Sequence, residues 1–219
     1  MCWSGGKDSA LAFHELSKNR RYKVVSLLTT VTADYDRVSM HGVRRILLQQ
    51  QARNMGLPVH EVSISRNCSN EEYESKVAEA LTNFKKGGVS SVIFGDIFLE
   101  DLRRYREENL AKLGMKAIFP IWGRDTTALS RSLEPSGFRA ITTCIDTRKL
   151  DKKFAGRVID TQFLDELPDG VDPCGENGEY HSFVFDGPMF KNKILFQTGE
   201  KMLRDSFFYF CDLVPVEAS

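Results

Sequence analysis

Short apolar runs alternate with segments of helical periodicity over the first two-thirds of the chain. Residues 22–31 are rich in β-branched side chains and predict a buried strand, whereas residues 42–55 place apolar side chains at helical spacing. The same alternation predicts further strands at 59–65, 89–94, 116–122 and 138–145, and further helices at 71–86, 101–113 and 126–133. Near-continuous apolar strands that alternate with helices indicate an α/β fold, in which a parallel sheet is covered by helices on both faces. Right-handed crossovers then favour a doubly wound sheet.

The pattern changes after residue 145. Residues 146–219 combine a short predicted helix near 157–167 with loops rich in Gly, Pro and Asp, a strand at 182–185 and an apolar segment at 193–196. We therefore predict two parts: a doubly wound domain over residues 1–145, and a small C-terminal α+β annex over residues 146–219 that packs on it.

The amino-acid composition excludes several classes of protein for this chain. The 219 residues include 42% hydrophobic and 27% charged residues, which is typical of a folded globular chain. Thirty Lys and Arg offset thirty Asp and Glu, and this balance argues against a dedicated duplex-DNA binder or a protein of anionic membranes. No apolar stretch is long enough for a membrane span, and the polar start predicts no signal peptide. The five scattered cysteines contain no C-x-x-C pair, so we predict reduced thiols and a cytoplasmic location.

The segment Ser4-Gly5-Gly6-Lys7-Asp8-Ser9 has the features of an anion-binding loop. It precedes residues with helical periodicity, so its backbone N–H groups and the positive end of that helix should point at the same place. The two glycines allow close approach and positive φ, and the two serines add hydroxyl donors. Lys7 adds a mobile positive charge, and Asp8 can orient the loop or hold Mg²⁺. The spacing matches neither a Walker A motif nor the Rossmann glycine pattern.

This hexapeptide resembles the PP-loop of the N-type ATP pyrophosphatases, which cleave ATP between the α and β phosphates. The resemblance implies an adenine nucleotide alpha hydrolase-like fold and ATP binding by Ser4, Gly5, Gly6, Lys7, Asp8 and Ser9. Thr29, Thr30 and Gly95 end predicted strands, and ligands of open α/β sheets bind at such ends, so we expect them in the same ATP site. Only residues 1–3 precede the loop, so the strand that leads into it is either truncated or begins upstream.

Three further segments carry candidate chemistry. His41 lies in residues 39–43, where a surface or packing role is equally open. The run 95–109 places Asp101, Arg104 and Glu108 on one helical face, which suits phosphate or carboxylate binding but is also typical of a solvated helix. The loop 170–183 gathers acids and an imidazole beside Cys174. That set can bind a cation or ammonia, act as acid or base, ligate a metal, or form a solvated turn. Its candidate residues are Glu176, Glu179 and His181.

Together these segments resemble the diphthine–ammonia ligase family of PP-loop ATPases over essentially the whole chain. After the loop at 4–9, the matching positions are Gly95, Asp101, Arg104, Arg106, Glu108, the run 122–125, Gly156, Arg157, Asp160, Gly175, Glu176, Gly178, Glu179, Tyr180 and Phe183. Asn177 departs from the second glycine of the late family loop, and His181-Ser182 departs from its acid–hydroxyl pair. We expect no counterpart here of the longer C-terminal regions of eukaryotic relatives.

The resemblance implies an ATP- and Mg²⁺-dependent ligase of diphthamide biosynthesis. It would adenylate a carboxylate of its acceptor, release pyrophosphate, and then let ammonia displace AMP. By resemblance the acceptor is diphthine on elongation factor 2, although a small-molecule acceptor and a homodimer are also expectations. We expect catalytic roles for Lys7, Asp8, Glu176 and Glu179, a metal-binding role for Asp8, and acceptor binding by His41, Arg104, Arg106, Glu108 and His181. Modification of an RNA base and nucleotide binding without turnover are the alternatives.

Overall fold

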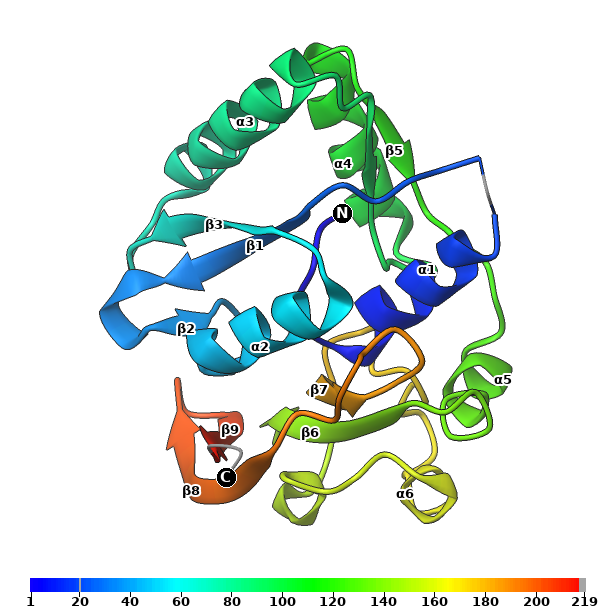
Figure 1. The fold of residues 1–219 in the computed structure, drawn as a ribbon. Coiled ribbons are helices and arrows are strands. Elements are labelled where there is room, and N and C mark those ends of the chain that lie inside the picture. Colours follow the sequence, from blue (N-terminus) through cyan, green and yellow to red (C-terminus); the bar gives the residue numbers. More distant parts are fainter. Residues whose placement is uncertain (20, 217–219) are drawn as a thin grey trace.

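Two pairs of parallel strands are joined by the first three residues of the chain. The computed structural model describes residues 1–19 and 21–216 (Figure 1). Strand β1 (Leu27–Thr32) pairs in parallel with β3 (Val59–Ile64), and β4 (Ser91–Ile93) pairs in parallel with β5 (Lys116–Ile118). The Cys2 N–H donates to the Ile93 carbonyl at 2.9 Å, and the Trp3 N–H donates to the Leu28 carbonyl at 2.8 Å. Residues 1–3 therefore occupy the central strand position, and the short β2 (Arg37–Val38) adds antiparallel to the far end of β1.

Helices cover both faces of this sheet, as the doubly wound prediction requires. Leu27 packs in one apolar cluster with residues of α1 (Lys7–Ser17) and α2 (Arg45–Met55). Its neighbour Leu28 packs in a second cluster with residues of α3 (Asn70–Lys86) and α4 (Glu100–Lys112). Because successive strand side chains point to opposite faces, the two clusters lie on opposite sides of the sheet. Figure 1 shows the two helix pairs on these opposite sides.

The rest of the chain forms an antiparallel sheet. Its strands are β7 (Tyr180–Asp186), β6 (Arg139–Asp146), β9 (Phe208–Pro215) and β8 (Phe196–Arg204), in that order across the sheet. The sequence prediction that 138–145 ends the parallel series is wrong, because β6 pairs antiparallel with both β7 and β9. An apolar run buried on both faces looks the same in either kind of sheet, so the pattern of β6 could not reveal its partners.

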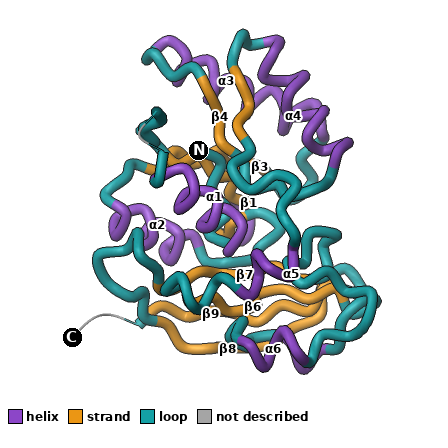
Figure 2. Tube along the Cα trace, turned by 90° about the vertical axis from the view of Figure 1, so that its right-hand side faces the viewer, coloured by secondary structure: helices purple, strands orange, loops and turns teal. Residues whose placement is uncertain are grey.

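Helices α1 and α2 form a layer between the two sheets (Figure 2). The main apolar cluster therefore continues from the parallel sheet through this layer into β6, β7 and β9. The outer face of the antiparallel sheet is covered by η2 (Lys152–Phe154) and α6 (Thr161–Asp165), whose Phe154 and Phe163 are buried. The remaining elements are η1 (Ala33–Tyr35) and α5 (Thr126–Arg131). In the described residues, no helix combines the length and the apolar character needed to cross a membrane.

A partly buried ion cluster links the two sheets. The Asp212 carboxylate on β9 accepts from Arg37 Nη1 at 2.7 Å and from Arg44 Nη2 at 2.6 Å. Burial alone would raise the Asp212 pKa, but the two guanidinium groups outweigh it and hold the pKa at about 2. This carboxylate thus stabilises the fold above the unfolded-state pKa of about 4, and the contribution is lost as pH falls toward 2.

We expect Asp212→Asn to lower the free energy of unfolding by about 1–3 kcal/mol at neutral pH, because two guanidinium groups lose a charged acceptor. The matched control is Asp165→Asn, which breaks the exposed Arg131–Asp165 pair and should cost less than about 1 kcal/mol. Urea titrations of both variants measure the difference, and equal losses would contradict a special role for Asp212.

Candidate active site

The loop 4–9 runs from the central strand position directly into α1. Gly5 has φ of 79°, a left-handed conformation that favours glycine. Gly6 is the N-cap of α1 and carries no capping side chain. The Lys7 N–H donates to Ser182 Oγ at 3.2 Å, so the N–H groups that follow it in the first helical turn are the ones left for an anion. The Ser9 hydroxyl donates to the Gly6 carbonyl at 2.9 Å and lies 3.4 Å from the Ser4 hydroxyl, which keeps both hydroxyl groups beside the loop.

Gln51 of α2 and strand β7 hold the loop from behind. The fully buried Gln51 side chain accepts from Trp3 Nε1 at 2.8 Å and donates to the Gly5 and Val184 carbonyls at 2.9 and 2.7 Å. The Val184 N–H also donates to the Gly5 carbonyl at 2.9 Å. Sequence reasoning missed Gln51, because a polar residue inside an amphipathic helix gives no sign of its tertiary partners. The loop conformation therefore depends on both parts of the chain.

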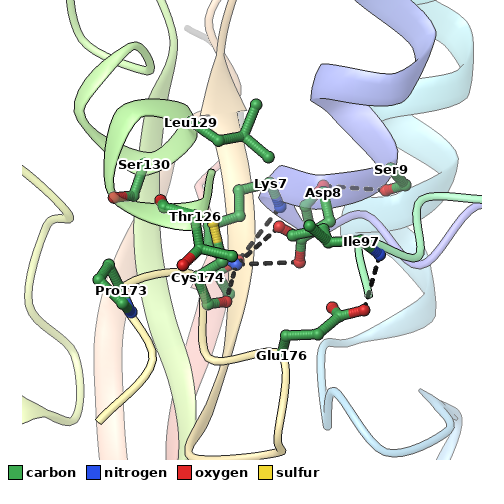
Figure 3. A network of polar contacts seen from close by, with 12 residues as sticks. Lys7, Asp8, Ser9, Ile97, Thr126, Leu129, Ser130, Pro173, Cys174 and Glu176 are labelled. Carbon is green, nitrogen blue, oxygen red and sulfur yellow. Dashed lines mark hydrogen bonds and ion pairs between the residues drawn. The ribbon is translucent and has the colours of Figure 1, made fainter. Parts of the chain in front are cut away.

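Lys7 is a fixed internal charge. Its side chain is 2% exposed, and the ammonium donates to both Asp8 carboxylate oxygens at 2.8 and 2.9 Å and to the Cys174 carbonyl (Figure 3). Burial opposes the charged form, but the adjacent Asp8 carboxylate outweighs it and raises the Lys7 pKa. The expectation of a mobile charge is wrong, because Tyr180 and the chain around Cys174, far away in sequence, close over the side chain.

A cleft of about 420 Å³ opens in front of this loop, at the carboxyl ends of β1 and β4. The predicted site residues that line it are Ser4, Asp8, Ser9, Thr29, Thr30, His41, Gly95, Arg106, Glu176 and His181. The structure thus gathers residues from five separate segments around one space. Gly5, Gly6 and Lys7 belong to the loop but lie behind the lining.

Glu176 is the carboxylate that the late loop presents to the cleft. Its Oε1 accepts from the Ile97 N–H at 2.7 Å (Figure 3). Its own N–H donates to Asp172 Oδ2 at 2.8 Å. Burial raises the pKa of Glu176 to about 7, and the hydrogen bond from Ile97 only partly offsets this. The carboxyl group therefore changes its protonation state near neutral pH, which suits a general acid or base.

Glu179 lies behind the same loop. Its side chain is 3% exposed, and its Oε1 accepts from the Asp172 N–H and from Asn177 Nδ2, both at 3.2 Å. These contacts brace the loop internally and do not reach the cleft lining. Asn177, which departs from the family glycine, is one of the two groups that hold this carboxylate.

His41 and His181 form a pair of imidazoles at the cleft wall. Their ring centroids are 4.7 Å apart, and His41 Nδ1 lies 3.2 Å from the Ser182 carbonyl. Since a carbonyl only accepts, that nitrogen carries the proton and Nε2 is left as an acceptor. Burial lowers the pKa of His41 to about 4 and that of His181 to about 3, so both rings are neutral at pH 7.

Only one of the predicted residues on α4 reaches the cleft. Arg106 pairs with Asp96, which is 8% exposed: Arg106 Nη2 is 3.0 Å from Oδ1 and Nε is 2.8 Å from Oδ2. Arg104 and Glu108 lie on the exposed side of the helix, outside the lining. Asp96 is not among the residues predicted from the sequence, although its position directly after Gly95, at the end of a predicted strand, is a signal that could have found it.

The carboxylates near the phosphate loop show whether the cleft could hold the expected Mg²⁺. Asp8 is 29% exposed and lines the cleft, and the Asp172 carboxylate is close enough to help raise its pKa, although burial is the main cause. Across residues 1–19 and 21–216, no group of three or more His, Cys, Asp or Glu side chains is arranged to hold a metal ion. One carboxylate at a phosphate loop fits Mg²⁺, which commonly takes one or two protein carboxylates together with substrate phosphates.

Gly95 brings the end of β4 against the loop. A Cβ at this position would lie 2.8 Å from the Asp8 carbonyl carbon and 2.8 Å from the Ser9 nitrogen. We expect Gly95→Ala to push the loop away and to weaken ATP binding about tenfold, at a cost of about 1–3 kcal/mol in overpacking. The control is Gly87→Ala at the end of α3, where the nearest atom is 3.3 Å away. Titration with ATP measures both variants, and equal affinities would refute a role for this contact.

A glycine-rich loop that opens the first helix of a doubly wound sheet, at the carboxyl edge of its central strands, defines an α/β nucleotide-binding protein of the PP-loop class. Family models agree: the diphthamide synthase N-terminal domain matches residues 1–117, and the diphthamide synthase C-terminal domain matches residues 125–212. The chain belongs to the diphthamide synthase family, which confirms the resemblance found in the sequence.

Curated relatives extend over most of the chain. A Danio rerio protein named diphthine–ammonia ligase is 30% identical over 223 residues, which cover 91% of this chain and 86% of that protein. The Homo sapiens protein of the same name is 27% identical over 226 residues, covering 93% and 84%. A Schizosaccharomyces pombe protein of the same name is 28% identical over 221 residues, covering 90% of this chain but 36% of that protein.

Proposed function

We propose that the chain is an ATP-dependent ligase that converts the carboxylate of diphthine on elongation factor 2 into an amide, using ammonia and releasing AMP and pyrophosphate. The names of the relatives support this reaction. The observation that carries it is the cleft itself, in which the phosphate loop at 4–9 faces the titratable Glu176. A cytoplasmic location and a homodimer remain predictions.

The first half of the reaction needs charge stabilisation at the phosphates. The acceptor carboxylate attacks the α-phosphorus, and the bond to pyrophosphate breaks. The N–H groups at the start of α1 and the Lys7 ammonium, held by Asp8, stabilise the charge that develops on pyrophosphate. Asp8 and the triphosphate oxygens would hold Mg²⁺, which when bound neutralises phosphate charge. Thr29, Thr30 and Gly95 border the nucleotide.

The second half needs a proton acceptor. Ammonia attacks the acyl carbon, and AMP leaves with the oxygen that it gained. We assign Glu176 to accept the proton that nitrogen loses, because it is the loop carboxylate that lines the cleft. Glu179 positions that loop from behind. Arg106, fixed by Asp96, borders the acceptor side of the cleft.

The RNA alternative depends on Cys174 as a nucleophile. Its side chain is 1% exposed, and burial raises the pKa of the thiol to about 12, so little thiolate is present at neutral pH. These observations favour a ligase over a cysteine-dependent RNA-modifying enzyme.

The test supplies ATP, Mg²⁺, ammonium and elongation factor 2 that carries diphthine. AMP, pyrophosphate and the mass of the modified peptide are then measured. We expect the three products in equal amounts. Pyrophosphate with transfer to tRNA would favour RNA modification, and nucleotide binding without pyrophosphate would favour a binding module.

A further inference from the structure

A second cavity, of about 530 Å³, adjoins the candidate active site. One wall comes from the segment 32–42, which contains η1 and β2, and the opposite wall comes from the β8–β9 hairpin at 204–210. Val38, Ser39, Met40 and His181 line both this cavity and the cleft. The cavity and the cleft therefore adjoin each other at these residues.

The cavity is lined by arginines and aromatic rings. Arg37 is neutralised by Asp212, at 2.7 Å. Arg66 has only a long 3.9 Å contact with Asp205, and both of these side chains are more than 60% exposed. Arg204 makes no ion pair within the described residues; its guanidinium lies 5.1 and 5.7 Å from the rings of Tyr35 and Phe210. Arg204 Nε and Nη2 lie 3.2 and 3.1 Å from Met202 Sδ, a weak acceptor, so both Arg66 and Arg204 have donors that a stronger, anionic acceptor can use.

Unusual backbone conformations gather at the same place. Within residues 1–19 and 21–216, the non-glycine residues with positive φ are Asp36, Met40, Asp205 and Ser206, at 51°, 65°, 47° and 67°. All four belong to the two segments that wall the cavity. Met40 is 66% exposed, so burial of its side chain does not explain its conformation. Asp205 and Ser206 form the turn of the β8–β9 hairpin, where positive φ is usual, whereas the left-handed conformation of Met40 costs about 1–3 kcal/mol and is of a kind concentrated at binding sites.

We propose that this cavity receives the polypeptide segment that carries the acceptor side chain, and that an acidic group of this segment pairs with Arg66 and Arg204. The inference rests on the proposed function and extends it to how the protein substrate is held. The segment lies between the hairpin and η1, and the reacting side chain passes Met40 and His181 into the cleft. The aromatic rings orient Arg204 and pack against the apolar parts of the segment.

The test compares Arg66→Gln and Arg204→Gln with Arg53→Gln, an exposed arginine at the end of α2 and remote from both cavities. Initial rates are measured while diphthine-bearing elongation factor 2 and ATP are varied in turn. We expect each of the first two variants to raise the KM for the acceptor about tenfold, as loss of one charge-assisted hydrogen bond predicts, while the KM for ATP stays within twofold. Arg53→Gln should leave both constants unchanged.

The measurements distinguish failure of the proposed function from failure of the cavity proposal. If the wild type makes no amide on the acceptor, the proposed function fails. If it does, and both variants keep the wild-type acceptor KM, the cavity proposal is overturned. If tRNA competes with the acceptor in the wild type but not in the two variants, the cavity binds RNA, and the cavity proposal is overturned as well. Arg66 is exposed, so Arg66→Gln should fold even if Arg204→Gln has a lowered melting temperature. In that case Arg204→Lys tests whether a positive charge alone restores binding of the acceptor.

Discussion

Replacing Lys7 with methionine should lower the rate of pyrophosphate release by about a hundredfold or more. Methionine keeps most of the buried volume but removes the ammonium group that Asp8 and the Cys174 carbonyl hold at the start of α1. Removal of a single preorganised donor to developing negative charge typically costs about 10²–10³ in rate. Single-turnover release of pyrophosphate from ATP, with acceptor present, measures the effect directly.

The matched control is Lys18→Met, at the other end of α1. The Lys18 side chain is 57% exposed and its ammonium pairs with Glu15, so its loss should leave turnover within twofold. Because Lys7 is buried, thermal melting must accompany the kinetics. Asp8 is partly exposed at the cleft, so water can solvate its carboxylate when the lysine is gone, and we expect a folded variant. A folded Lys7→Met protein with normal pyrophosphate release would refute the loop mechanism.

The sequence predicted the parallel sheet well, because its evidence is local. The helix at 42–55 ends at Gly56, and the structure gives α2 over Arg45–Met55 with Gly56 in a left-handed conformation. The strand at 138–145 was found but assigned to the wrong sheet, since apolar runs do not specify partners. Strand β9 was not predicted at all. Its aromatic and apolar run does favour a strand, but its pairing with β6 and β8 is long-range in sequence and could not be read from that run.

In the candidate site, too, the features set by local sequence were predicted and those set by distant contacts were not. The hexapeptide at 4–9 encodes its own turn and helix start, so its position at the cleft followed from local chemistry. The burial of Lys7 and the orientation of Glu176 depend on contacts with residues more than 75 positions away, which no local motif contains. On α4, helical spacing grouped Arg104 with Glu108, yet Arg106 is the residue that faces the cleft. Only the packing of α4 decides which face is exposed.

Glu176→Gln should separate the two halves of the reaction. Glutamine keeps the size of the side chain and can still accept from the Ile97 N–H, but it cannot take a proton. Pyrophosphate release in the absence of ammonia should stay within a few fold, whereas amide formation should fall about 10²–10⁴-fold, the usual worth of a general base. Glu200→Gln, on the exposed face of β8, is the control and should leave both halves unchanged.

The pH dependence gives a second, independent readout of Glu176. With its pKa near 7, amide formation at constant free ammonia should rise about tenfold per pH unit below neutrality and level off above it. In Glu176→Gln this inflection should vanish.

The stability of the folded protein should change with pH in the opposite direction. Because the folded state raises the carboxyl pKa, it favours the protonated form of Glu176. This stabilising contribution is complete below about pH 4 and is lost as pH rises through 7. Between pH 5 and 8 the melting temperature of the wild type should therefore fall by more than that of Glu176→Gln. Parallel melting curves, or a rate profile that keeps its inflection in the variant, would remove Glu176 from the role of proton acceptor.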